Sequence, residues 1–213
     1  GVVAKEGTLV DASFVKVPKQ RNKRVDNADI KKGAIPLEFG KNKNKLSQKD
    51  CDARWVTKYK TKEFGYKDHV SVDQKTKVIT SYTVTASSTH DSQAIKELIN
   101  EDDTILYADS AYKSQEIEDY LKENNVKSKI INRAYRNKAL TNNQHKLNHK
   151  HSKTRVRVEH IFGTLKTSLN NGLSLKSIGF ERIKSITGLL NLTYNLLRYE
   201  QLVRLKNIPI MKS

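Results

Sequence analysis

The sequence predicts an α/β fold in which a mixed five-stranded sheet carries helices on its faces. Short runs rich in β-branched and aromatic residues, each bounded by turn residues, recur over the first two thirds of the chain and indicate strands. Apolar residues at helical spacing separate the later strands and dominate the last third. Strands in direct succession, followed by alternating helices and strands, favour a sheet that mixes parallel and antiparallel neighbours.

Five strands are expected, and the first three follow one another. The run TLVDASFVKV is apolar on both faces, which predicts a buried strand. The next two runs flank QKTK and predict a hairpin, and the fourth is the short apolar TILYAD. The expected strands cover residues 8–17, 65–73, 77–85, 104–109 and 126–132.

The helices follow the hairpin. Thr89 or Asp91 can cap the first of them, and the second begins with acids, which the helix dipole favours there. The expected helices cover residues 89–100, 114–125, about 139–170 and 181–205. This order of elements is the one used by ribonuclease-H-like nucleotidyl-transfer folds. We expect one such domain over residues 1–213, with residues 18–60 as an irregular basic insertion, because that segment has Pro, Gly and many Lys without periodicity.

The charge balance predicts a polyanionic partner. The chain holds 40 Lys and Arg against 23 Asp and Glu, a formal net charge of +17. The excess is clustered, because residues 16–62 and 127–157 are strongly basic whereas residues 91–123 are acidic. Clustered cations release counterions from a phosphate backbone, which favours nucleic acid over the alternative of a merely solvated basic surface.

The cysteine count and the hydropathy pattern predict the compartment. Cys51 is the single cysteine, which excludes an internal disulfide and favours a reducing, cytoplasmic setting. No apolar run approaches the roughly 18 residues of a spanning helix, so no membrane partner is expected. The chain begins without Met, and we expect an N-terminal region upstream of it.

Three carboxylates stand at positions that suggest chemistry. Asp11 lies in the middle of the first strand, Asp109 at the C-terminal tip of the fourth, and Glu159 on a helix. Adjacent first and fourth strands, crossed by that helix, would bring them together. Three oxygen ligands suit a phosphoryl-transfer site with two Mg²⁺ ions about 3.5–4 Å apart. Each residue also has a structural alternative: a loop hydrogen bond for Asp11, a turn cap for Asp109, and a pair with Arg155 for Glu159.

The helix around Glu159 has two faces. It is the only acid between Glu123 and Glu181. Helical spacing places it on one face with Arg155, Phe162 and Lys166, so that cations flank the carboxylate. The neighbouring stripe anchors the helix to the core and consists of Val158, Ile161 and Leu165.

At this point the chain resembles bacterial insertion-sequence transposases of the DDE type, from about Gly7 to Leu205. The segments that carry the resemblance, in order, are GTLVDAS, DARWVTKYKTKEFGYKDHVSVD, THD, YADSAY, RVRVEHIFGTLK and GLLNLTYNLLR. The resemblance implies that Asp11, Asp109 and Glu159 bind catalytic Mg²⁺, with Mn²⁺ as an alternative. It also implies cleavage of transposon-end DNA and transfer of the 3′ end to target DNA.

The family signature is Tyr, two residues, Arg, three residues, Glu, six residues, Lys. Arg155, Glu159 and Lys166 match it, whereas Ser152 stands in the Tyr position, a departure that affects any role of that ring at the transposon end. Lys67 and His69 share a strand face, and the family often has Lys and His there. The DNA contacts that we expect are Arg155, Lys166, Arg157, Lys67, His69, Lys60 and Lys62.

The expected partners are double-stranded DNA, as transposon end and as target, and a second copy of the chain on that DNA, in a nucleoid-associated bacterial setting. Two alternatives remain open at this point. One is a related nuclease that cuts without joining, and the other is a non-catalytic, truncated DNA-binding remnant of a mobile element. The presence of all three acids argues against the remnant.

Overall fold

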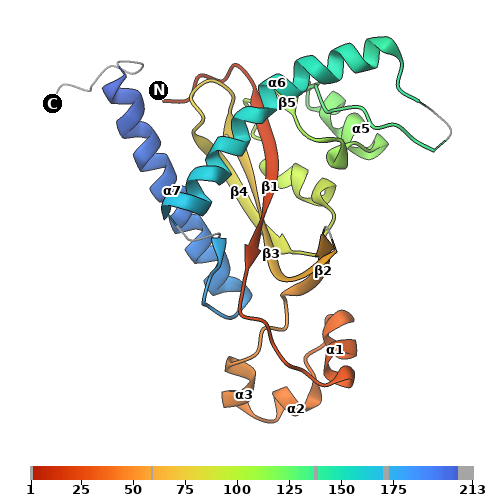
Figure 1. Ribbon diagram of the computed structural model, residues 1–213, viewed down its shortest axis with the longest axis vertical. Helices are drawn as coiled ribbons and strands as arrows, with labels where there is room; N and C mark the ends of the chain where they lie inside the picture. Colours follow the sequence, from red (N-terminus) through yellow and green to blue (C-terminus); the bar gives the residue numbers. More distant parts are fainter. Residues whose placement is uncertain (1, 59, 137–138, 170–172, 206–213) are drawn as a thin grey trace.

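A computed structural model describes residues 2–58, 60–136, 139–169 and 173–205 (Figure 1). Six strands form one mixed sheet with the order β2-β3-β1-β5-β6, and β4 pairs with β3 as well. The strands are β1 Thr8–Lys16, β2 Arg54–Lys58, β3 Thr61–Asp73, β4 Ile79–Ala86, β5 Ile105–Tyr107 and β6 Lys127–Ser128. β1 runs antiparallel to β3 and parallel to β5, which confirms the mixed α/β sheet.

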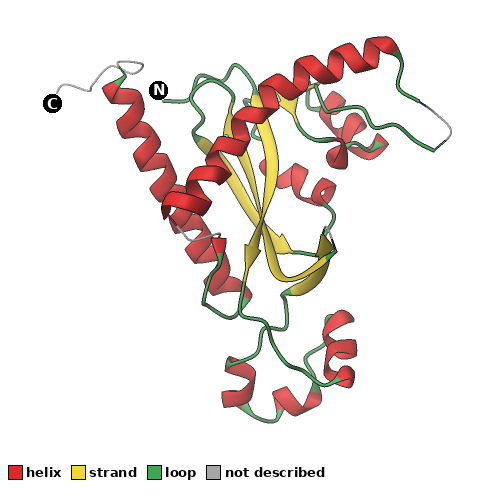
Figure 2. Ribbon diagram, viewed as in Figure 1, coloured by secondary structure: helices red, strands yellow, loops and turns green. Residues whose placement is uncertain are grey.

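Helices cover both faces of this sheet (Figure 2). The longer ones are α5 Gln115–Glu123, α6 Asn142–Thr164 and α7 Phe180–Arg204, and the shorter ones are α1 Arg24–Lys31, α2 Leu37–Gly40, α3 Lys43–Ser47 and α4 Ile95–Leu98. α6 packs on the face that carries Leu9, whereas α4 and α5 pack on the face that carries Val10. None of the described helices is long and apolar enough to span a bilayer.

The segment from residue 18 to 60 is more regular than the sequence indicates. It contains α1, α2, α3 and the sixth strand, β2, in place of an irregular insertion. The helices are short, with only Asp26, Ile30 and Phe39 buried in them, so they show too few apolar positions for a helical period. β2 is held by its pairing with β3, where the Trp55 and Phe64 rings pack 5.2 Å apart, and such a contact is not local in sequence.

Two other expected elements are shorter than their sequence patterns. The helix expected over residues 89–100 is a 3₁₀ turn, Asp91–Ala94, followed by the single turn of α4, and the side chain of His90 caps it. The strand expected over residues 126–132 is regular only in β6. Its backbone nevertheless continues beside β5, because the amides of Lys129 and Ile131 donate to the carbonyls of the neighbouring strand segment.

The register between β1 and β5 positions two of the candidate residues. Leu9 lies opposite Tyr107, and both belong to the core cluster that holds α6. Asp11 and Asp109 follow two residues later on their respective chains, so alternation of side chains turns both toward α6. The expected neighbours, the first and fourth predicted strands with the helix crossing them, are therefore observed.

A buried carboxylate lies where α7 covers β3. Asp68 is 1% exposed and accepts a hydrogen bond of 3.3 Å from the side-chain amide of Asn191. Burial raises the pKa of Asp68 from 3.8 to about 7, against a smaller opposing effect of that amide. The folded protein therefore retains a proton that the unfolded chain releases.

We expect the Asp68→Asn variant to be more stable than the wild type above about pH 7. Between about pH 4 and about pH 7 the unfolded wild type loses the Asp68 proton while the folded protein keeps it, so this group lowers stability as pH rises. The difference should reach several kcal/mol at about pH 8 and vanish below about pH 4. Urea unfolding at a series of pH values measures it, with the exposed Asp102→Asn as control. Parallel pH profiles of wild type and Asp68→Asn would contradict this account.

Candidate active site

One guanidinium joins two of the three predicted carboxylates. Arg155 donates from Nη1 to Asp11 Oδ2 at 2.9 Å and from Nη2 to Glu159 Oε1 at 3.4 Å. The Asp11 and Arg155 side chains are 20% and 18% exposed, whereas Glu159 is 58% exposed. Glu159 therefore does pair with the arginine one turn before it, as the structural alternative expects. The same arginine also contacts Asp11 on β1.

The charges of the other two carboxylates act on Asp11. Burial raises the pKa of Asp11, and the charges of Asp109 and Glu159 raise it further. The backbone amide of Ala12, which donates to Oδ1 at 2.8 Å, and the charge of Arg155 lower it. Asp11 thus lies within electrostatic range of both other carboxylates. A buried carboxylate with two like charges nearby requires a cation, and in this arrangement Arg155 supplies it.

Asp109 has the local role that the sequence left open for it. It caps the 3₁₀ turn Ser110–Tyr112, because its Oδ1 accepts from the amide of Ser110 at 2.6 Å. This bond uses one carboxylate oxygen and fixes the orientation of the other. The capping interaction and a ligand role are compatible, since a carboxylate has several acceptor positions.

The donor set fits a hard divalent cation by its chemistry. Asp11, Asp109 and Glu159 supply oxygen only, which Mg²⁺ prefers to nitrogen or sulfur. Among the described residues, no three His, Cys, Asp or Glu side chains are already arranged to hold an ion. The guanidinium of Arg155 lies between two of the predicted ligands, so binding of an ion there requires that side chain to move.

Lys67 and His69 lie on the opposite side of the sheet from Asp11. His69 is paired with Ala12, the neighbour of Asp11 on β1, so its ring points to the other face. Nε2 of His69 contacts Thr85 Oγ1 at 2.8 Å, the residue is fully buried, and burial lowers its pKa to about 4. In this placement the ring is buried and faces no phosphate, and the direct DNA contact expected of His69 stays a prediction.

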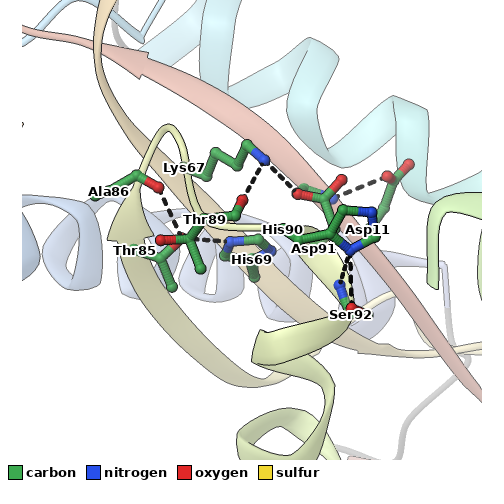
Figure 3. A network of polar contacts seen from close by, with 10 residues as sticks. Asp11, Lys67, His69, Thr85, Ala86, Thr89, His90, Asp91 and Ser92 are labelled. Atoms are coloured by element: carbon green, nitrogen blue, oxygen red, sulfur yellow. Dashed lines mark hydrogen bonds and ion pairs between the residues drawn. The ribbon is translucent and has the colours of Figure 1, made fainter. Parts of the chain in front are cut away.

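Lys67 holds a loop rather than facing solvent (Figure 3). Its ammonium donates to Asp91 Oδ1 at 2.6 Å and to the carbonyl of Thr89 at 2.7 Å. Both partners belong to the segment that leads into α4. Lys67 therefore fixes Asp91 close to the sheet, and its charge is already matched.

Other expected DNA contacts spread away from Asp11. Lys60 and Lys62 are exposed at the start of β3. Lys62 lies eight residues before Val70, the partner of Asp11, which is about 27 Å along the strand. Lys166 follows the end of α6 in a π-helical turn, Leu165–Leu169, and its ammonium lies 5.9 Å from the centre of the Phe162 ring.

Tyr112 and Asp91 lie near the carboxylates and were not among the predicted site residues. The Tyr112 hydroxyl is buried without a hydrogen-bond partner among the described residues. Burial raises its pKa, and Asp91, Asp11 and Asp109 raise it further, in that order, so the hydroxyl lies within electrostatic range of all three. Both residues stand in segments that carry the family resemblance: Asp91 in THD and Tyr112 in YADSAY. Those segments could have pointed to the two residues as members of the site.

Comparison with known proteins gives independent evidence on the family of this chain. The family described as the transposase DDE domain matches residues 4–196. The transposase for insertion sequence element IS1106 from Neisseria meningitidis serogroup B is 32% identical over 163 residues, which cover 74% of this chain and 52% of that protein. The chain thus spans about half the length of this curated relative. No solved structure matches.

Proposed function

Because the chain belongs to the transposase DDE domain family, we propose that it cleaves DNA at a transposon end and transfers the 3′ end to target DNA. The observation that carries the proposal is that Arg155 joins Asp11 and Glu159, while the charge of Asp109 acts on Asp11 from the neighbouring strand segment. These three residues come from two adjacent strand segments and the helix that crosses them. Such a set concentrates negative charge on an otherwise basic protein.

In this proposal Asp11, Asp109 and Glu159 hold two Mg²⁺ ions, with Mn²⁺ as an alternative. When bound, divalent ions activate an attacking oxygen and stabilise the leaving oxygen in phosphoryl transfer. The protein's own residues supply position. The Ser110 amide orients Asp109, the Ala12 amide orients Asp11, and the core residues of α6 fix the height of Glu159 above the sheet.

Arg155 has two roles in this scheme. It neutralises Asp11 and Glu159 in the observed arrangement. If Asp11 and Glu159 held divalent ions instead, the guanidinium of Arg155 would be free to bind a phosphate, which its planar donors suit. Arg155 and Lys166 then become the nearest DNA contacts, and Lys60 and Lys62 reach the duplex several base pairs away.

The natural partner is double-stranded DNA, both as transposon end and as target, bound by a homodimer. The clustered net charge of +17 supports the DNA assignment. A dimer would present two active sites to the two ends of one element.

A strand-transfer assay tests the proposal. The substrate is a pre-cleaved duplex of the inverted repeat that flanks the gene, and the target is a supercoiled plasmid, with Mg²⁺, with Mn²⁺ or with EDTA. We expect joined products with either metal and none with EDTA. Cleavage of uncut ends without any joining would favour the nuclease alternative, and DNA binding without metal-dependent chemistry would favour the remnant.

A further inference from the structure

A second basic site lies on the other side of α6 from the carboxylates. A cleft of about 440 Å³ separates α6 from the C-terminal half of α7 and opens beside the turn between β3 and β4. Its described lining residues are Lys77, His160, Thr164, Tyr194, Leu197, Arg198, Glu200, Gln201 and Arg204.

The cations of this cleft repel one another. Burial lowers the pKa of Lys77, and the nearby charges of Arg198 and Arg157 lower it further. None of these three side chains forms an ion pair with a described carboxylate. Glu200 is the only carboxylate among the described lining residues, and it pairs with Arg204 at 3.4 Å. The cleft therefore has an excess of positive charge that an anion would relieve.

The side chains around the cleft are held in place by backbone groups. Arg198 Nε donates to the carbonyl of Thr76 at 2.7 Å, and the Tyr194 hydroxyl donates to that of Lys77 at 2.9 Å. From α6, Arg157 Nη1 donates to the carbonyl of Gln74 at 3.3 Å. Both arginines are thus anchored to the same turn that presents Lys77. Pre-ordered donors lose little conformational entropy when they bind a ligand.

The cleft and the carboxylates lie on opposite flanks of α6. Arg157 precedes Glu159 by two residues, which places the two side chains about 160° apart around α6. Glu159 and Arg157 therefore project from opposite flanks of one helix, whose diameter with side chains is about 10–12 Å. A duplex lying across α6 would reach both flanks.

We propose that this cleft binds a backbone phosphate of the DNA on which the carboxylates act, using its lining residues Lys77 and Arg198 together with Arg157, which lies beside it. The inference rests on the proposed function for the identity of the DNA. Since phosphates advance about 3.4 Å per step along one strand, the bound phosphate lies roughly three steps from the scissile one. α6 then acts as the ridge that the DNA crosses.

The test compares Lys77→Gln and Arg157→Gln with wild type. Lys77 is the cleaner position, because its side chain makes no hydrogen bond among the described contacts. The matched control is Lys122→Gln, an exposed residue on α5 at the other face of the sheet with the same loss of charge. Binding to a short fluorescent duplex of arbitrary sequence is measured at several salt concentrations, and thermal melting verifies that each variant is folded.

We expect Lys77→Gln to weaken binding about tenfold at low salt and to reduce the slope of log K against log salt by about 0.9. The control should change neither by a comparable amount. On a transposon-end duplex, which is bound in one register, replacing single phosphates by neutral methylphosphonates should lower the affinity of the wild type at one position near the third step from the scissile bond. The same replacement should not lower the affinity of Lys77→Gln. Equal salt slopes for Lys77→Gln and Lys122→Gln would overturn the proposal.

Two further measurements distinguish a failure of the cleft proposal from a failure of the proposed function. The first is thermal melting with inorganic phosphate. If phosphate raises the melting temperature of the wild type but not of Lys77→Gln, and Lys77→Gln binds DNA as tightly as the wild type, the cleft binds a free anion and the proposed DNA contact is overturned. The second is cleavage: a wild-type protein that binds a transposon-end duplex but never cleaves it contradicts the proposed function, while the salt-slope comparison still decides the role of the cleft.

Discussion

The Asp109→Asn variant is expected to cleave DNA about a thousandfold more slowly than wild type, with its fold and DNA affinity unchanged. A carboxylate that holds a catalytic cation contributes several kcal/mol of transition-state stabilisation, and each 1.36 kcal/mol corresponds to a factor of ten in rate. Asn keeps the side-chain oxygen that accepts from the Ser110 amide, so the turn after β5 stays capped. The substitution therefore removes charge and leaves the local structure.

The rate of Mg²⁺-dependent nicking of a transposon-end duplex measures this effect under single-turnover conditions. Asp102→Asn is the matched control, because its side chain is 67% exposed and, among the described residues, pairs only with the exposed Lys5. Calorimetric titration with Mn²⁺ provides a readout separate from activity, and the heat of binding should be lost in Asp109→Asn alone. Wild-type cleavage by Asp109→Asn would remove Asp109 from the site.

The Gly65→Ala variant is expected to lose about 3 kcal/mol of stability, the largest effect that we expect of a single methyl group in this chain. A Cβ added to Gly65 would lie 2.0 Å from the carbonyl oxygen of Val15 and 3.1 Å from its carbon. Both are backbone atoms of β1, so no side-chain rotation relieves the clash. β1 and β3 would have to separate where Lys16 pairs with Gly65.

Urea unfolding monitored by circular dichroism measures the loss. Gly163→Ala is the control with the opposite sign, because Gly163 lies in α6 with nothing within 4 Å of its added Cβ. Alanine there should raise stability by up to about 1 kcal/mol through helix propensity. If Gly65→Ala unfolds at the wild-type urea concentration, the close approach of β1 and β3 is not as described.

The parts of the fold that follow from local pattern were predictable. The strand around Asp11, the short strand before Asp109 and the apolar stripe of α6 all carry clear periodicity, and the topology of such a sheet brings them together. The short helices between β1 and β2 were not predictable, because α1 and α2 bury only one or two side chains each and α3 buries none. The same limitation applies to β2, whose pairing with β3 decides its conformation.

The sequence suggests the candidate residues but not their contacts. Asp11, Asp109 and Glu159 were proposed as ligands from their positions, and that assignment stays a prediction. The double contact of Arg155 depends on the height of α6 above β1. His69 shows a further limit. Its spacing from Lys67 establishes that the two share a face, but only the register with β1 reveals that this face is opposite to Asp11. Pairing register is a tertiary property.

The parallel contact of β1 with β5 has a consequence for the order of folding during synthesis. β1 can pair with β3 once the chain up to Asp73 has left the ribosome. The strand segment with Asp109 must then dock beside β1 across a long loop, and α6 follows later still. The complete carboxylate set therefore exists only after most of the chain has been made, so a nascent chain that has not yet extended to α6 contains no assembled site.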